Sequence, residues 1–190
     1  MFIFHHQFST GQVVAATGVS NATLQTWLKR DVIVAQPPEA AEHELTITGG
    51  GKPGAHRRFS FFNVMEIALA KTLIDAGLRD LDNAFKAARH FAHSGCGPIE
   101  NVRPARSPGC PFDTAGTSAT TLLAVREDQS GEFLYKVGSD VLPLIWHRIG
   151  GRDGFVLIVA QVVFDRVVAA LGFNPEEVLA LAYGRRGPNQ

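Results

Sequence analysis

The chain has 190 residues, enough for one domain of good size or two small ones. Apolar residues make up 45% of it and charged residues 19%, which is typical of an ordinary soluble globular protein. The 18 basic and 18 acidic residues cancel, so the chain is not coated in positive charge. Any binding of nucleic acid must therefore depend on local clusters of basic residues.

The sequence predicts neither secretion nor a membrane span. The N-terminus, MFIFHHQFST, lacks the basic region and the long apolar core of a secretory signal. The most apolar stretch, residues 155–173, is interrupted by Asp165 and Arg166 and holds no uncharged run of bilayer length. With only Cys96 and Cys110, a disulfide scaffold is not expected, and we predict a reducing, cytoplasmic location.

The first elements in chain order are two short helices joined by a tight turn. Ser9 or Thr10 is suited to cap a first helix that runs to about Thr17. Gly18 supplies the backbone freedom for a sharp turn, and Val19 is expected to fill the corner between the helices. The pattern predicts a helical hairpin at this end of the chain.

The second helix is expected to begin after Ser20. Leu24, Trp27 and Leu28 have the i, i+3, i+4 spacing of one buried helical stripe. This arrangement leaves polar residues on the other faces, namely Asn21, Gln25, Thr26, Lys29 and Arg30.

A linker at residues 35–43 precedes a predicted two-stranded ribbon. Its extended pieces, residues 44–48 and 55–59, flank GGGKPG, which has the composition of a turn or flexible loop. Ser60 is expected to cap a third helix over about residues 61–76, closed by Gly77. A fourth helix is predicted at about residues 81–92.

The chain changes character at residues 94–118, which are rich in Gly, Pro and Ser and lack periodicity. We predict a linker or long loop here and a domain boundary at residues 94–117. Beyond it, two β-rich runs flank DQSG and predict a hairpin. Residues 141–149 are ambiguous, because Pro143 disfavours a helix interior.

The last part of the chain predicts a small α/β unit. Residues 155–160 are expected to form a buried strand, and residues 175–183 a last helical piece. Between them, residues 161–171 predict a helix with four inward residues, Phe164, Val167, Val168 and Leu171.

The order of helix, tight turn, helix, two-stranded ribbon and helix is the layout of a winged helix–turn–helix domain. In that fold a recognition helix enters the major groove, and small residues at its N-terminus allow close approach to base edges. A basic ribbon beside it contacts phosphates. On the pattern alone, the alternative is a generic helical hairpin followed by a surface β-turn.

Two segments in this order resemble the DNA-binding domain of MerR-type transcription regulators. Residues 8–30, FSTGQVVAATGVSNATLQTWLKR, are similar to the family's opening, in which a helix ending in Thr-Gly-Val-Ser precedes a second helix. Residues 54–78, GAHRRFSFFNVMEIALAKTLIDAGL, are similar to its returning wing strand and next helix. The resemblance covers residues 8–78 and implies a winged helix fold, binding of double-stranded DNA and regulation of transcription.

The sequence also departs from that family. Gln25, Thr26 and Trp27 stand where the family commonly has Arg-Tyr-Tyr, so the contact made by that Arg is not carried over. This variant is closer to excisionase-like relatives, which share the fold and act as architectural factors. Residues 81–92 are too short for the family's dimerising helix, and its metal- or drug-sensing tail is not recognisable.

We therefore predict an α+β protein with a MerR-like winged helix–turn–helix domain at residues 1–93 and a small α/β domain at residues 118–190. The second domain would dimerise or bind a ligand or protein partner. The expected function is sequence-specific binding of double-stranded DNA by a homodimer. The predicted DNA-binding residues are Ser20, Asn21, Thr23, Gln25, Thr26, Lys29, Arg30, Lys52, His56, Arg57 and Arg58.

An alternative function is that of a structural nucleoprotein factor. An excisionase-like factor or a phage packaging adaptor would assemble on DNA through the second domain. A further alternative makes that domain a ligand or metal sensor.

Other chemistry has weaker support in the sequence. His90, His93, Cys96 and Cys110 are residue types that bind zinc, but their spacing matches no strong zinc pattern, so no metal or cofactor is predicted. GGGKPG precedes a strand-like segment rather than the helix of a P-loop, which favours a wing tip.

The sequence has no G-x-S-x-G nucleophile elbow and no prominent pair of carboxylates, so an enzyme is not predicted. In the second domain, Trp146 and His147 are candidates to line a pocket, although a core tryptophan is the favoured interpretation.

Overall fold

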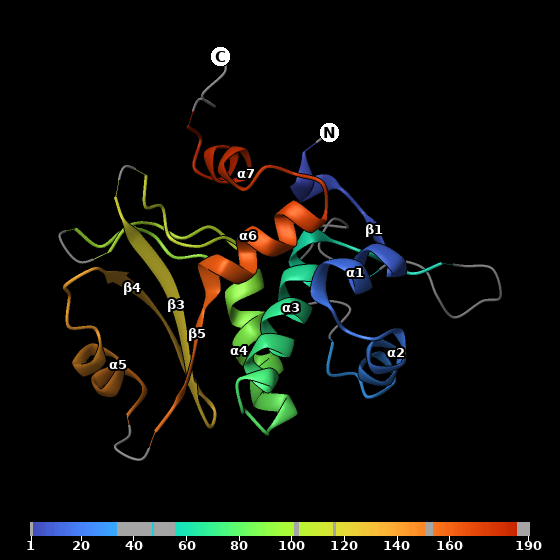
Figure 1. Ribbon diagram of the computed structural model, residues 1–190, viewed down its shortest axis with the longest axis horizontal. Coiled ribbons are helices and arrows are strands. Elements are labelled where there is room, and N and C mark those ends of the chain that lie inside the picture. Colours follow the sequence, from blue (N-terminus) through green and yellow to red (C-terminus); the bar gives the residue numbers. More distant parts are fainter. Residues whose placement is uncertain are drawn as a thin grey trace.

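The computed structural model describes residues 2–33, 47, 56–100, 103–115, 117–150 and 154–185. These residues form an α+β fold, as predicted. Helices α3 and α4 occupy the centre, with α1 and α2 on one side and a three-stranded sheet on the other (Figure 1). The helices are η1 (Ile3–His5), α1 (Thr10–Thr17), α2 (Asn21–Lys29), α3 (Phe61–Asp75), α4 (Leu81–His93), α5 (Leu142–Ile149), α6 (Ala160–Ala170) and α7 (Pro175–Ala182). The strands are β1 (Phe8–Ser9), β2 (Arg58–Phe59), β3 (Ala119–Arg126), β4 (Gln129–Lys136) and β5 (Val156–Val159).

Helices α1 to α4 begin at or next to the predicted residues, because a short polar side chain caps the start of each one. Ser9 and Ser60 each form a reciprocal capping box with the third residue of the helix that follows, Gln12 and Asn63. After α3, Gly77 takes a φ of 108°, which a residue with a side chain rarely adopts. The chain can therefore turn sharply into α4.

The strand before α3 pairs with a segment that the sequence did not predict as a strand. β2 is antiparallel to β1, with Phe8 opposite Phe59 and Ser9 opposite Arg58. The predicted partner of this strand, residues 44–48, lies outside the described residues except for Ile47. The described pairing ties the start of α1 to the start of α3, and the wing itself stays a prediction.

The second sheet is antiparallel with the strand order β4-β3-β5. The predicted hairpin is confirmed, but the turn lies at residues 127–128 rather than over DQSG. Arg126 pairs with Gln129, and Glu127 takes a φ of 49° between them. A two-residue turn suffices here, so the residues from Gln129 onward join the strand.

The segment that was ambiguous in the sequence is helix α5. Pro143 lies in its first turn, where the missing amide proton removes no helical hydrogen bond. Ile145 and Ile149 pack on the outer face of the sheet, whereas Trp146 is 49% exposed. The prediction of a core tryptophan is therefore wrong, since only one side of this short helix meets the sheet.

Strand β5 is an edge strand, and the prediction of a buried strand is wrong for half of its residues. Ile158 points into the core, but Leu157 is 38% exposed and Val159 40% exposed. Helix α5 packs against β3 and β4, so this end of the outer face has less cover. Helix α6, which follows directly, buries Phe164, Val167 and Val168 as predicted, while Leu171 is only half-buried.

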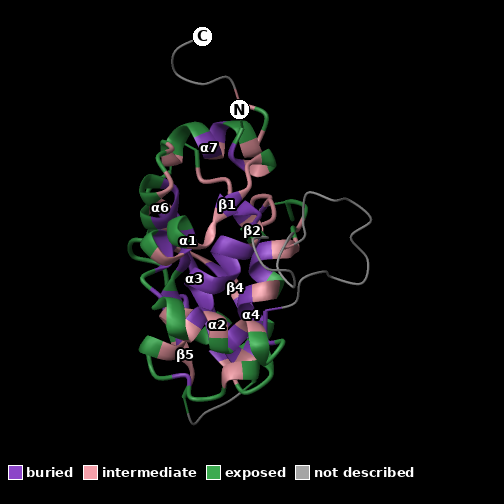
Figure 2. Cartoon of the chain, turned by 90° about the vertical axis from the view of Figure 1, so that its right-hand side faces the viewer, coloured by how far each residue is buried: buried purple, intermediate pink, exposed green. Residues whose placement is uncertain are grey.

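One continuous core joins the N-terminal helices to the inner face of the sheet and to α6 and α7. Helix α3 is buried along most of its length and contacts α1, α4 and α6 (Figure 2). The segment predicted as a linker contributes Cys110 and Phe112 to the interior. The division into two domains stays a prediction. Within the described ranges, no helix has the length and apolar character needed to cross a bilayer.

Candidate nucleic-acid interface

The turn between α1 and α2 is fixed by local hydrogen bonds. Gly18 adopts a left-handed φ of 70°, and Val19 is almost fully buried at the corner, as predicted. The Thr17 hydroxyl donates to the Val13 carbonyl at 2.7 Å and accepts from the Val19 amide at 3.3 Å. These contacts set the angle between the two helices.

Helix α2 is anchored by one side and capped at its start. Leu24 is fully buried, Trp27 nearly so, and the Trp27 ring meets the Phe85 ring of α4 edge-on at 5.1 Å. The Ser20 hydroxyl accepts from the Thr23 amide at 3.0 Å and lies 2.8 Å from the Thr23 hydroxyl. Ser20 and Thr23 therefore serve the helix cap in this structure.

The opposite side of α2 is solvent-exposed (Figure 2). Asn21, Thr26, Lys29 and Arg30 are exposed there, although the Thr26 hydroxyl donates back to the Ala22 carbonyl at 2.9 Å. Lys29 and Arg30 lie at the C-terminal end of the helix, where its dipole favours positive charge. This side presents polar and cationic groups over two helical turns.

Arg57, which immediately precedes β2, contacts this surface of α2. Arg57 Nη1 donates to Gln25 Oε1 at 2.9 Å, and Gln25 Nε2 donates to Asn21 Oδ1 at 3.4 Å. Asn21, Gln25 and Arg57 therefore form a polar row that joins α2 to the segment before β2. Sequence reasoning placed all three in one site but missed this bond, because the partners are 32 residues apart.

The remaining predicted residues of the interface divide into two groups. His56 and Arg58 flank Arg57 in the chain, and both are exposed. Arg58 lies in β2, opposite Ser9 of β1. Lys52 lies outside the described residues. The structure therefore brings Arg57 to α2, and His56 and Arg58 lie beside Arg57 in the chain.

A cluster of charged side chains around the buried Glu66 contacts the chain just after α2. Glu66 of α3 has no exposed surface, and its two carboxylate oxygens contact Arg89 Nε at 3.2 Å and His93 Nε2 at 2.9 Å. Arg89 also donates to the Val32 carbonyl, just after α2. The cluster links α3, α4 and the end of the helix–turn–helix. A lone Glu inside the apolar run of α3 was the sequence signal for it.

Three of the four candidate zinc ligands have other partners, and the fourth, Cys110, is buried. His93 contacts Glu66, and His90 Nδ1 lies 3.2 Å from Glu132 Oε1 on β4. The side chain of Arg103 donates to Cys96 Sγ, while burial raises the pKa of Cys110 to about 12. Within the described part of the chain, no group of three His, Cys, Asp or Glu side chains is arranged to hold a metal ion.

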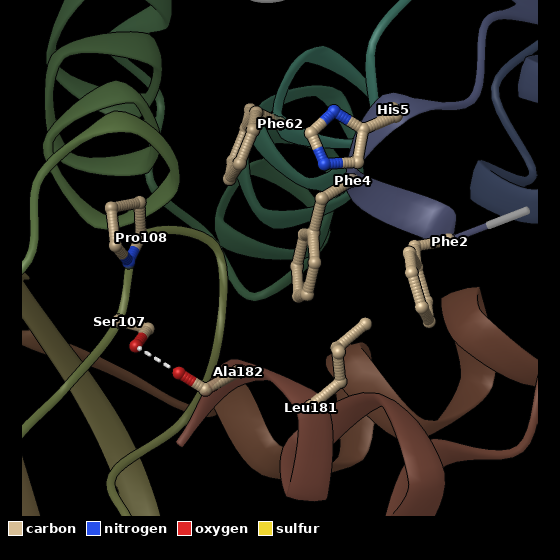
Figure 3. Close-up of a pocket in the computed structure, with 8 residues that line it drawn as sticks. All are labelled: Phe2, Phe4, His5, Phe62, Ser107, Pro108, Leu181 and Ala182. Atoms are coloured by element: carbon tan, nitrogen blue, oxygen red, sulfur yellow. Dashed lines mark hydrogen bonds between the residues drawn. The ribbon is translucent and has the colours of Figure 1, made fainter. Parts of the chain in front are cut away.

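The structure also contains an apolar hollow of about 340 Å³ between the N-terminal segment and α7. Phe2, Phe4 and Leu181 turn toward one another across it, and a hydrogen bond from Ser107 to the Ala182 carbonyl borders it (Figure 3). It lies away from α2 and adds no polar group to the interface.

Comparison of the chain with known protein families and with curated proteins gave no match. The resemblance to MerR-type regulators therefore stays a prediction, and function must be argued from the geometry of the site.

Proposed function

We propose that this protein binds double-stranded DNA with sequence preference and regulates transcription, with α2 as the recognition helix. One observation carries the proposal. Leu24 and Trp27 hold α2 on the core, while its other side exposes amide, hydroxyl and cationic groups next to Arg57. An α-helix fits the major groove of B-DNA, and positive charge beside an exposed helix favours contact with the phosphates. These features of α2 suit binding to a DNA duplex.

The side chains of the interface suit two kinds of contact. Asn21 and Gln25 carry amides of the type that recognises adenine, and Gln25 is already oriented by Arg57. Lys29, Arg30 and Arg58 are exposed cations suited to phosphate oxygens. Because the chain as a whole is neutral, we propose that a homodimer doubles these contacts in the cytoplasm.

The salt dependence of DNA binding tests the proposal. The double variant Arg57→Ala with Arg58→Ala removes two cations, so the slope of log K against log salt should become shallower by about 1–2 units. A matched control is Lys86→Ala with Lys136→Ala, which removes two exposed cations from α4 and β4, on the sheet side of the molecule (Figure 1). An equal change of slope in both double variants would contradict a contact of Arg57 and Arg58 with DNA.

A second candidate function is architectural assembly on DNA. Leu157 and Val159 on the edge strand β5 and Val162 on α6 form exposed apolar surface on which copies of the chain could associate. A footprint separates the two functions. One short palindromic site supports a regulator, whereas extended, cooperative and weakly specific coverage supports assembly.

A further inference from the structure

A cavity of about 480 Å³ lies beside the edge strand β4, lined by residues of β4, α4, α5 and the segments 95–99 and 103–112. Its walls combine two kinds of group. Phe112, Phe133 and Leu144 supply apolar surface, and Arg103, Arg106 and Arg148 supply positive charge. Cavities of this size hold drug-sized ligands, which bury an apolar body and place a few polar groups.

The acidic residue in the wall, Glu132, is already neutralised by the protein. Its Oε1 lies 3.2 Å from both Arg106 Nη2 and His90 Nδ1. Arg103 and Arg148 have no acidic partner among the described residues. Among the described residues, the wall of the cavity therefore carries more positive charge than its one carboxylate balances.

Arg106 makes the cationic wall rigid. Its side chain is almost completely buried, donates to the Phe91 and Ser94 carbonyls at 2.8 Å each, and lies over the Phe91 ring at 4.4 Å. Its Nε is buried and has no hydrogen-bond partner among the residues that the structure describes.

We propose that this cavity binds a small organic anion with an apolar body. Arg103 and Arg148 would hold the anionic group, which a guanidinium recognises through charge-assisted hydrogen bonds. Phe112, Phe133 and Leu144 would cover the apolar body. The hollow of Figure 3 lacks this combination, since no arginine or lysine is among the described residues that line it.

Binding of the anionic dye 8-anilinonaphthalene-1-sulfonate tests the proposal on the full chain without DNA. We expect saturable fluorescence at one dye per chain, and about tenfold weaker binding in Arg103→Gln and in Arg148→Gln. The uncharged analogue N-phenyl-1-naphthylamine should bind both variants as it binds the original protein. Arg79→Gln, an exposed arginine outside the cavity, is the matched control.

A second pair of variants isolates charge without touching the arginines. Leu144 is exposed at the cavity mouth, so Leu144→Glu and Leu144→Gln should both fold, and only the first should weaken binding of the sulfonate strongly. The proposal is overturned by dye affinity that is equal in the arginine variants and the control. It is also overturned if Leu181→Ala, in the hollow of Figure 3, abolishes the signal. Neither result bears on DNA binding, so the two proposals fail independently.

Discussion

Removing the Glu66 carboxylate should cost more stability than removing any exposed carboxylate on the same helix. Glu66 is fully buried and contacts two nitrogens, Arg89 Nε and His93 Nε2. Glu66→Ala leaves Arg89 without its carboxylate partner and opens a void. Breaking a buried ion pair by deleting one partner costs about 3–5 kcal/mol, and we expect a loss at the lower end of that range because the Arg89 side chain is 32% exposed and keeps its bond to the Val32 carbonyl. Glu66→Gln keeps one acceptor, so about 1–3 kcal/mol is expected.

Urea unfolding monitored by circular dichroism measures both losses. The matched control is Asp75→Ala at the end of α3. Asp75 pairs with Lys71 at 2.5 Å, but its side chain is 61% exposed, so the pair contributes about 0.2–1 kcal/mol. If Glu66→Ala and Asp75→Ala lower the free energy of unfolding equally, burial of the Glu66 cluster does not stabilise the fold as described.

The other predictions concern titration and thiol reactivity. The hydrogen bond to Glu132 raises the pKa of His90 above 6.5. Burial alone would raise the pKa of Glu132, but the hydrogen bond from His90 and the charge of Arg106 hold that pKa below 4.5. The pair therefore stabilises the fold fully between about pH 4.5 and 6.5. This stabilisation is lost as the pH rises through the pKa of His90, and it is also lost as the pH falls through the pKa of Glu132. NMR titration should show the His90 pKa falling in Glu132→Gln; an unchanged value would contradict the pairing. Cys96 should react quickly with a thiol reagent, whereas buried Cys110, with a pKa of about 12, should react only on unfolding. Two fast thiols in the folded protein would refute its burial.

Local features of the fold could be predicted from the sequence. Ser9, Ser20 and Ser60 start helices because a cap depends on residues only three positions apart. The stripe of Leu24 and Trp27 could be predicted because helical periodicity is local as well. These signals were enough to predict the helix–turn–helix and its exposed side.

Features that depend on distant partners could not be predicted. β2 pairs with β1, and Arg57 reaches Gln25, only because the whole fold brings them together. The same holds for the exposed Trp146 and for Leu157, whose faces depend on how far α5 covers the sheet. Periodicity marks an apolar side chain as a core candidate but does not tell which part of a sheet stays uncovered.

Selection of bound sites from random duplex DNA tests the central claim most directly, because it measures binding, sequence preference and symmetry together. We predict that the protein enriches a short motif as two half-sites related by a two-fold axis. We also predict that Gln25→Ala alters the preferred bases while still retaining DNA. A protein that retains no duplex at low salt, or enriches no sequence at all, would contradict the assignment of α2 as a recognition helix.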